Sequence, residues 1–251
     1  MIKVDKLREF MKSNFNLVKD IETDQMKGLP QPSLEKEYDT DKELIDLKPG
    51  DEINIQNADL ISNIKNRKSH RKFNNDPVTK DELSFLLWAT QGVKKIFERN
   101  KKAYATFRTV PSAGARHPLE TYLLINNISG LKKGLYRYLA LEHKLLFLNK
   151  IQDAATKITS ATQGQKFIGE AAVVFIWSCI AYRGEWRYNI ASHKAMLLDA
   201  GHLCQNLYLA CEGIAAGTCA IAAYDQDKVD KLIGVDGQNE YSVYLAPVGK
   251  Y

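Results

Sequence analysis

The sequence predicts a single α+β domain, and three observations support this prediction. The chain has 251 residues, 45% of them hydrophobic, which is enough for one substantial core or at most two small domains. Its β-rich segments are short and are broken by Asn, Gly and charged residues, as is typical of antiparallel neighbours. Helices and strands do not alternate in the regular way of a βαβ array.

Residues 1–58 are less periodic than the rest of the chain. A short amphipathic stretch, Val4 to Met11, is followed by a polar segment that is rich in charge and contains Pro30, Pro32 and Pro49. We expect residues 1–58 to be an N-terminal extension. Residues 59–251 are expected to form the domain itself.

Two helices are expected at the start of the domain. Leu60, Ile61 and Ile64 recur at helical spacing and run into a basic segment. Thr79 and Glu82 have the spacing of a capping box, in which the side chain of the first residue and that of the third residue of the helix each bind a free backbone N–H. A helix is therefore predicted to start immediately after Thr79.

The middle of the chain favours strands, and a long helix follows. Short strands are expected at 121–126, 134–139 and 145–148, and a buried strand at 171–179. Apolar residues at every third or fourth position then predict a helix over 190–213. Because this helix has apolar residues on its other sides too, we expect it to be buried nearly all round, in a core or at a subunit interface. The last elements expected are a strand at 217–223, a helix at 225–233 and a strand at 241–246.

Composition excludes several classes of protein. With 26% charged residues and 10% aromatic residues, the chain is not disordered over most of its length. Its longest apolar run, 171–182, falls short of the ~20 residues that span a bilayer as a helix, and its first ten residues contain no apolar signal core. We expect a soluble, cytoplasmic protein that does not enter a membrane.

Four cysteines, Cys179, Cys204, Cys211 and Cys219, lie in apolar surroundings without a CxxC pair. They are expected to be reduced, buried side chains, and no metal site is predicted. The chain contains no GxGxxG, GxxxxGK[ST], GxSxG or HExxH motif, which disfavours nicotinamide and ATP domains of those types as well as common hydrolases.

The charge balance is mildly basic, with 35 basic and 30 acidic residues. A net charge of +5 favours anionic partners, for which a phosphorylated cofactor is sufficient, and no nucleic acid is expected. Basic residues cluster at 67–72 and again at 94–102. A solvated surface is the ordinary explanation for such clusters.

Three segments have residues suited to ligand binding. Arg67, Lys68, Ser69 and Arg71 combine cations with a hydroxyl donor, which is the chemistry that a terminal phosphate requires. In 111–118, small residues beside Arg116 would let backbone amides approach a flat ligand, although a plain tight loop has the same composition. In 212–219, Gly213 and Gly217 would end the long helix and permit a close approach, although ordinary helix termination explains them equally well.

Taken in order, four motifs resemble the nitroreductase family of FMN flavoproteins. They are RKSHRKF at 67–73, PSAGARHPLE at 111–120, DAGHLCQNLYLACEGIAAGTCAIAAY at 199–224 and APVGK at 246–250. The resemblance covers about 60–251. The form PSAGARHPLE is most similar to the branch that contains azoline (thiazole/oxazole) dehydrogenases of peptide-modifying systems and their stand-alone relatives.

The resemblance implies a fold and an assembly. It predicts a central, mainly antiparallel sheet flanked by helices, in an intertwined homodimer with two FMN sites at the subunit interface. The helix at 190–213 would be the spine of this dimer. By the same resemblance, the cofactor-binding residues would be Arg67, Lys68, Ser69, Arg71, Pro111, Ser112, Ala113, Gly114, Arg116, Gly217, Thr218, Ala222, Ala223 and Lys250.

The resemblance assigns each segment a part of the cofactor. Residues 67–71 match the segment that holds the FMN phosphate and ribityl chain, and 111–116 match a loop that reaches the flavin ring from the partner subunit. Gly217 and Thr218 match the strand entry below the flavin. The backbone of 221–224 would face flavin N5 and O4, and Lys250 would be a terminal basic contact.

The implied reaction is ping-pong hydride transfer from NAD(P)H through FMN to a small electron acceptor such as a nitroaromatic or a quinone. Because the flavin performs the chemistry, no side chain is required as a catalyst. An azoline dehydrogenase is the nearest alternative, but those enzymes use a Lys-Tyr pair, and here Tyr182 is not preceded by lysine. A flavin-binding protein without turnover is a further alternative. The acceptor, the preference for NADH or NADPH, the role of residues 1–58 and any peptide-modifying complex stay open.

Overall fold

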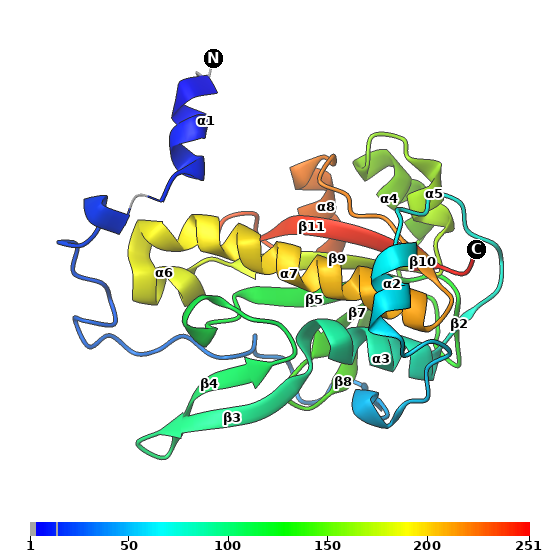
Figure 1. The fold of residues 1–251 in the computed structure, drawn as a ribbon, viewed down its shortest axis with the longest axis horizontal. Coiled ribbons are helices and arrows are strands. Elements are labelled where there is room, and N and C mark those ends of the chain that lie inside the picture. The colour runs from blue at the N-terminus through cyan, green and yellow to red at the C-terminus, as the bar shows by residue number, and fades with distance from the viewer. Residues whose placement is uncertain (1–3, 14) are drawn as a thin grey trace.

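A seven-stranded sheet forms the centre of the computed structural model, which describes residues 4–13 and 15–251 (Figure 1). The strand order is β1-β8-β7-β5-β9-β11-β10, and every pairing in this sheet is antiparallel. This confirms the predicted α+β fold with an antiparallel sheet. The strands are β1 (Leu44–Asp46), β5 (Leu119–Ile125), β7 (Gly134–Leu139), β8 (Lys144–Asn149), β9 (Val173–Ile180), β10 (Gly217–Thr218) and β11 (Glu240–Gly249).

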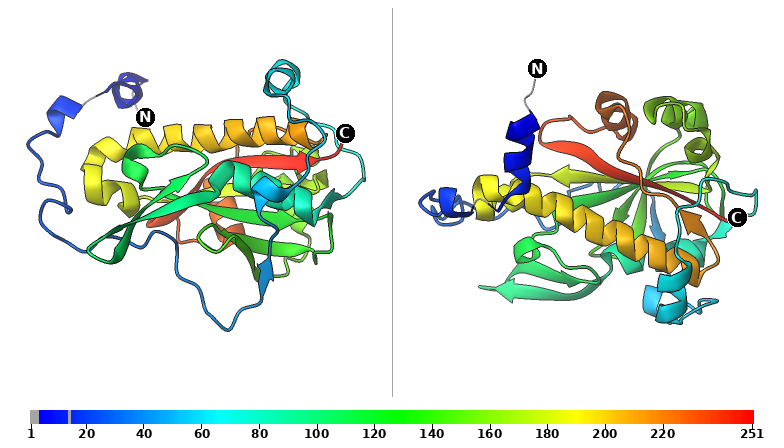
Figure 2. Two further views of the ribbon diagram at one scale, coloured as in Figure 1. Left: turned by 60° about the horizontal axis from the view of Figure 1, so that its bottom comes forward. Right: turned by 45° about the horizontal axis from the view of Figure 1, so that its top comes forward.

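Helices cover both faces of this sheet (Figure 2). Successive side chains of a strand point to opposite faces, and β9 illustrates the result. Its Phe175 and Trp177 join a core with the helices α3 and α7, whereas Val174 and Ile176 join a second core with α4, α5 and α8. This explains why β9 is a continuous apolar run instead of an alternating one. The helices are α3 (Lys80–Gln91), α4 (Ala154–Ala161), α5 (Lys166–Glu170), α7 (Ser192–Gly213) and α8 (Gln226–Ile233).

Helix α3 forms where the capping pattern predicts it. The Thr79 side chain accepts from the backbone N–H of Glu82, and the Glu82 carboxylate accepts from the N–H of Thr79. Helix α2 (Leu60–Asn66) precedes it, with Asp59 as its N-cap. A short parallel pair, β2 (Val78–Thr79) with β6 (Ile128–Ser129), fixes the start of α3 beside the sheet.

Helix α7 crosses one face of the sheet along its whole length (Figure 1). Met196, Leu203 and Leu207 lie in the core below it. Leu197 and Leu198 point the other way and are 49% and 56% exposed. Within one chain the helix is therefore buried on one side only. Another protein surface would be needed to cover the exposed side of α7.

The N-terminal segment reaches the same sheet. Helix α1 (Val4–Met11) has no buried residue, and Figure 1 shows it standing off the body. Further along, β1 pairs with β8 and forms one edge of the central sheet. The part of the predicted extension that precedes residue 58 thus contributes a strand to the domain, and the boundary at 58 stays a prediction.

One local prediction needs correction, and two elements were not expected. The strand expected at 217–223 ends at Thr218, because the backbone N–H of Ala220 is bound by the Tyr208 hydroxyl and only Ile221 returns to pair with Leu245. The basic residues at 94–102 belong to a hairpin, β3 (Val93–Arg99) and β4 (Lys102–Arg108), that was not expected. Helix α6 (Tyr182–Tyr188) was also not expected.

Three further findings concern the cysteines, the helices and the metal-ligating side chains of the described residues. The cysteines at 179, 204, 211 and 219 are all free and buried, as predicted. In the described part of the chain, no helix combines the length and the apolarity needed to cross a membrane. No cluster of three or more His, Cys, Asp or Glu side chains among residues 4–13 and 15–251 has an arrangement suited to a metal ion.

Candidate functional site

The basic segment 67–71 lies directly beside β10, at the carboxyl end of α7. Ser69 forms a parallel bridge with Thr218, and the backbone N–H of His70 donates to the carbonyl of Thr218 at 2.9 Å. The fold therefore brings the four residues predicted in 67–71 next to Gly217 and Thr218. About 150 positions separate the two segments in sequence.

Gly217 is required by the close approach of His70. A Cβ atom at position 217 would lie 2.5 Å from Cγ of the His70 ring, closer than real side chains come. On its other side the His70 ring packs against Tyr251, with 3.8 Å between ring centroids. Burial and the nearby Lys68 lower the pKa of His70, which favours the neutral form of the ring. Its Nε2 atom is buried and has no hydrogen-bond partner among the described residues.

The cations of this segment have an acidic neighbour, Glu212, which interacts with Arg67 and Lys68 over a longer distance than an ion pair. Arg67 places its guanidinium 5.1 Å from the centre of the Tyr208 ring, and Lys68 and Arg71 are exposed. None of the three forms an ion pair within the described part of the chain. Residues 68–74 and Tyr251 line a shallow open groove. Positive charge, backbone amides and a hydroxyl around such a groove suit an anionic group.

Tyr208 holds the segment in place and was not predicted as a site residue. Its hydroxyl accepts from the N–H of Ala220 at 2.8 Å and lies 2.9 Å from the Ser69 hydroxyl. It therefore joins the basic segment, α7 and the chain after β10. The available sequence signal was a tyrosine on the apolar face of a helix, where a buried hydroxyl needs a partner.

Lys250 lies near this group but its ammonium is already bound. The Lys250 Nζ donates to Glu82 Oε1 at 2.7 Å and to the carbonyl of Ile214. Its backbone contacts the chain just after the basic segment, where the Asn74 N–H donates to the Lys250 carbonyl. A second acid, Glu212, has its pKa raised by burial, while the neighbouring Lys68 and Arg67 act in the opposite direction.

The loop 111–116 forms a separate, tightly fixed group. The Ser112 hydroxyl donates to Asp199 Oδ2 at 2.6 Å, and the N–H of Ala113 also points to this carboxylate. Burial raises the pKa of Asp199, and the two donors partly offset this rise. Gly114 has a φ of 59°, and a Cβ there would meet the Tyr188 hydroxyl at 2.5 Å. Asp199 was not predicted, since its partner lies 87 positions away.

Arg116 is a buried cation in this loop. Its guanidinium lies 4.9 Å from the centre of the Tyr104 ring and 5.6 Å from that of Trp186. It donates to the carbonyl oxygens of Gly114 and Tyr104. Burial lowers the pKa of Arg116, yet the side chain stays charged at neutral pH. Its bonds within the loop give it a local role in shaping 111–116.

Within one chain the two groups are apart. The loop is fixed at Asp199 and the basic segment at Tyr208, and nine residues of α7 correspond to about 13 Å along its axis. The remaining predicted residues lie elsewhere. Ala222 and Ala223 are exposed beyond β10, and Pro111 opens the loop. The Tyr182 hydroxyl donates to Asp24 Oδ2 at 3.0 Å, so it faces the N-terminal segment.

Comparison with known proteins identifies the family. A nitroreductase family model matches residues 64–250. The chain is 30% identical over 207 residues to a nitroreductase-named protein of Methanocaldococcus jannaschii, covering 80% of this chain and 98% of that one. It is 26% identical over 136 residues to the trifolitoxin-processing protein of Rhizobium leguminosarum bv. trifolii, covering 51% of this chain and 36% of that one.

Two solved structures share the fold. A nitroreductase-named protein of Anabaena variabilis superimposes with a TM-score of 0.75 at 23% identity, over 97% of this chain and 45% of that one. The microcin synthetase McbBCD complex of E. coli gives a TM-score of 0.61 at 17% identity, over 100% of this chain and 98% of that one. These likenesses show the fold, and the family match over three quarters of its length together with the 30% identity to the M. jannaschii protein shows that the chain belongs to the nitroreductase family.

Proposed function

We propose that the chain is an FMN-dependent oxidoreductase that takes hydride from NAD(P)H and delivers it to a small acceptor such as a nitroaromatic or a quinone. Membership of the nitroreductase family supports oxidoreductase activity in general. The observation that carries the proposal further is the junction of 67–71 with β10. There, Lys68 and Arg71 line a groove together with His70, and Arg67 lies next to them over the Tyr208 ring. Among the described residues, these cations have no ion-pair partner and the buried His70 Nε2 has no hydrogen bond.

These residues fit the phosphate end of FMN. Arg67, Lys68 and Arg71 would neutralise a phosphate dianion, and the Ser69 hydroxyl would donate to it. Gly217 keeps the backbone of β10 bare of side chains where it meets the segment. When bound, FMN supplies a two-electron carrier between the nicotinamide and the acceptor. The protein itself would bind and orient the cofactor and leave one face of the flavin ring accessible.

The loop 111–116 would position the ring end of the cofactor. Asp199 and Gly114 fix its backbone in one conformation, so little entropy would be lost when a flat ligand binds against it. Since this loop lies about 13 Å along α7 from the basic segment, we propose that a second copy of the chain supplies the loop to each site. The exposed Leu197 and Leu198 on α7 would then be covered in a homodimer.

An absorbance spectrum of the purified protein with added FMN, followed by anaerobic addition of NADH and then NADPH, tests the proposal. We expect flavin to stay with the protein on a desalting column and its absorbance to bleach within seconds of adding one donor. Protein that takes up no FMN contradicts the proposed cofactor. Bound flavin that neither donor reduces contradicts the proposed reaction.

A second candidate is an azoline dehydrogenase in peptide modification. It is favoured by the likeness to the trifolitoxin-processing protein and to the microcin synthetase complex. Against it, Tyr182 is engaged with Asp24 and Ala181 precedes it instead of a lysine. Flavin that is reduced by a thiazoline-containing peptide, and not by NADH or NADPH, would favour this candidate.

A further inference from the structure

The hairpin β3–β4 is strongly basic and has no role in the proposed reaction. Figure 1 shows it extending away from the central sheet. Five cations lie on its exposed surface against one carboxylate, Glu98, so this surface carries an excess of four positive charges in a chain whose net charge is +5. The cations are Lys94, Lys95, Arg99, Lys101 and Lys102.

These charges have no partners in the structure. None of the five cations forms an ion pair with another described residue, and only Arg99 has a ring contact, 5.5 Å from the centre of Tyr104. Exposed apolar side chains lie among them. Ile96, Phe97 and Phe107 are 43%, 45% and 49% exposed, which combines apolar surface with uncompensated positive charge.

The outer edge of β3 is also open. Lys94 to Arg99 make backbone hydrogen bonds only with β4, in the part of the chain that the structure describes. The outer edge of β4 is different, since its Tyr104 carbonyl accepts from Gln31 and Arg116 and its Thr106 carbonyl contacts His117. An unpaired strand edge offers alternating backbone donors and acceptors to another extended chain.

A groove runs beside this open edge. Lys94, Lys95 and Ile96 form one side of it, and residues of the segments 47–51 and 140–143 form the other. The far side is apolar at Leu47 and Leu141 but carries the carboxylates of Asp51 and Glu142. Acidic groups of a ligand would therefore be favoured near the tip, at 99–102, and apolar groups deeper in the groove.

We propose that the β3 edge is a docking site for an extended peptide segment that is acidic at one end and apolar at the other, bound as an added strand. Pairing with a second copy of β3 is disfavoured, because it would bring two groups of four excess positive charges together. A nucleic acid fits less well, since it lacks the alternating amide groups that the edge can bind. Phe97 also meets Tyr104 and Phe107 edge to face, at 72° and 68°, and so is not a flat stacking platform.

Fluorescence anisotropy with a synthetic probe tests this docking site. The probe is a labelled ten-residue peptide with glutamates in one half and alternating valine and threonine in the other. We expect saturable binding that weakens with salt. We expect at least tenfold weaker binding when glutamates are replaced by lysines, and also when alternate valines are N-methylated, since methylation removes the amide donors that an added strand needs.

Protein variants locate the site. The charge reversal K101E/K102E should weaken probe binding at least tenfold. The matched control K132E/K133E, which changes two adjacent exposed lysines in another turn between strands, should change it less than twofold. Equal binding of the N-methylated peptide, equal loss in both variants, displacement of the probe by an equimolar oligothymidine, or no saturable binding would each overturn the proposal. Because no flavin is involved in this measurement, its failure leaves the proposed function standing.

Discussion

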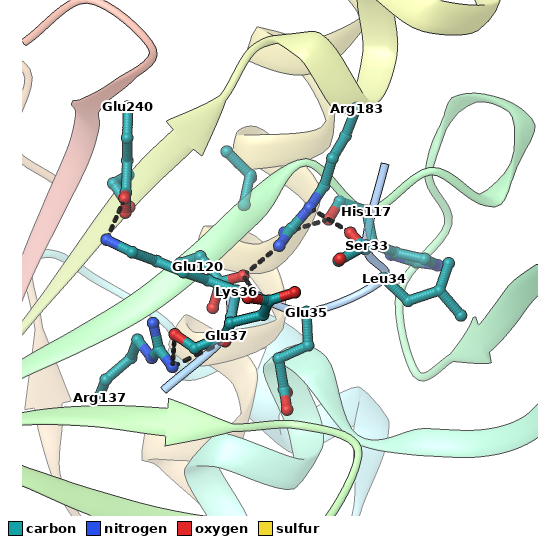
Figure 3. A network of polar contacts seen from close by, with 12 residues as sticks. Ser33, Leu34, Glu35, Lys36, Glu37, His117, Glu120, Arg137, Arg183 and Glu240 are labelled. Carbon is teal, nitrogen blue, oxygen red and sulfur yellow. Dashed lines mark hydrogen bonds and ion pairs between the residues drawn. The ribbon is translucent and has the colours of Figure 1, made fainter. Parts of the chain in front are cut away.

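Two charged regions of the molecule differ in whether their charged side chains have partners within the chain. Below residues 33–37, a network joins Glu120 to Arg183 and Lys36 to Glu240, and ties Arg137 to backbone carbonyls of the segment (Figure 3). Glu120 and Arg183 are each 4% exposed and lie 2.7 Å apart. At 67–71, by contrast, Lys68 and Arg71 line a groove, Arg67 lies next to them, and none of the three has an ion-pair partner in the described residues. Paired charge holds the fold together, whereas unpaired converging charge is available to a ligand.

The buried network fastens the N-terminal segment to the sheet. Arg183 Nε donates to the carbonyl of Ser33, and Arg137 donates to the carbonyls of Lys36 and Glu37. In return, the N–H of Lys36 donates to Glu120. Backbone groups and side chains thus largely satisfy one another, as buried polar groups require, with Arg137 Nε the exception among the atoms of this network. This explains how a polar segment without helices or long strands can follow one path across the sheet.

The largest expected effect comes from breaking the buried pair. Arg183→Ala would leave the Glu120 carboxylate buried with part of its compensation gone, and we expect the free energy of unfolding to fall by about 3–5 kcal/mol. Urea denaturation followed by circular dichroism measures it. The exposed Arg99→Ala is a matched control and should change the free energy by less than about 0.5 kcal/mol. Equal midpoints for the two variants would mean that the pair does not stabilise the fold.

Glu35 gives the same network a pH dependence. Burial raises the pKa of Glu35 to about 7, while the Leu141 N–H that it accepts acts in the opposite direction. The folded state therefore holds the proton more tightly than the unfolded state, so the contribution of Glu35 to stability falls as pH rises from about 4.5 to about 7. We expect the stability difference between Glu35→Gln and the parent to shift by roughly 2–3 kcal/mol in favour of the variant over this range.

Denaturation curves at pH 4.5, 5.5, 6.5 and 7.5 would follow this difference. Asp236→Asn is an informative control because hydrogen bonds lower the pKa of Asp236 below its ordinary value of 3.8, so this carboxyl is ionised in both states over the range and its difference from the parent should stay nearly constant. A constant difference between Glu35→Gln and the parent across the four pH values would contradict the buried, protonated carboxyl.

Substitutions in the basic segment 67–71 should change the affinity for FMN and leave the free energy of unfolding nearly unchanged. Arg71→Ala removes one cation from the groove without breaking any ion pair in the described structure, and we expect FMN to bind about 10- to 100-fold more weakly, which corresponds to about 1.5–3 kcal/mol for a charged hydrogen bond. Fluorescence titration with FMN measures the affinity. Lys133→Ala, an exposed lysine far along the chain, should leave it unchanged. Full flavin occupancy of Arg71→Ala at limiting FMN would argue against a phosphate at this groove.

Sequence reasoning recovered those parts of the fold that depend on neighbouring residues. The capping box of α3 is local, since Thr79 and Glu82 are three positions apart, and it formed as predicted. The hairpin β3–β4 was missed because it is solvated on much of its surface and shows no clear alternation of apolar and polar residues. Its basic composition was therefore interpreted as a charged surface.

For the candidate site, the motifs were visible but their spatial relations were not. Residues 67–71 and 217–218 stand at opposite ends of the domain in sequence, and only the sheet and α7 bring Ser69 to Thr218. Tyr208 and Asp199 hold the two groups, yet each acts through a partner more than 80 positions away. The 13 Å between the groups along α7 is likewise a property of the folded chain.

The smallest expected effect concerns the loop 111–116. Asp199, which holds this loop, is intermediate between the two charged regions, because it is buried and accepts hydrogen bonds but has no ion pair in the described residues. Asp199→Asn replaces a charged acceptor for Ser112 by a neutral one, so we expect a loss of about 1 kcal/mol in the free energy of unfolding. A cycle with Ser112→Ala isolates this interaction. If Ser112 and Asp199 act together, the double variant is less destabilised than the sum of the single variants by about 1 kcal/mol. If the two changes in the free energy of unfolding simply add, the hydrogen bond between Ser112 and Asp199 does not stabilise the loop, and burial alone holds it in place.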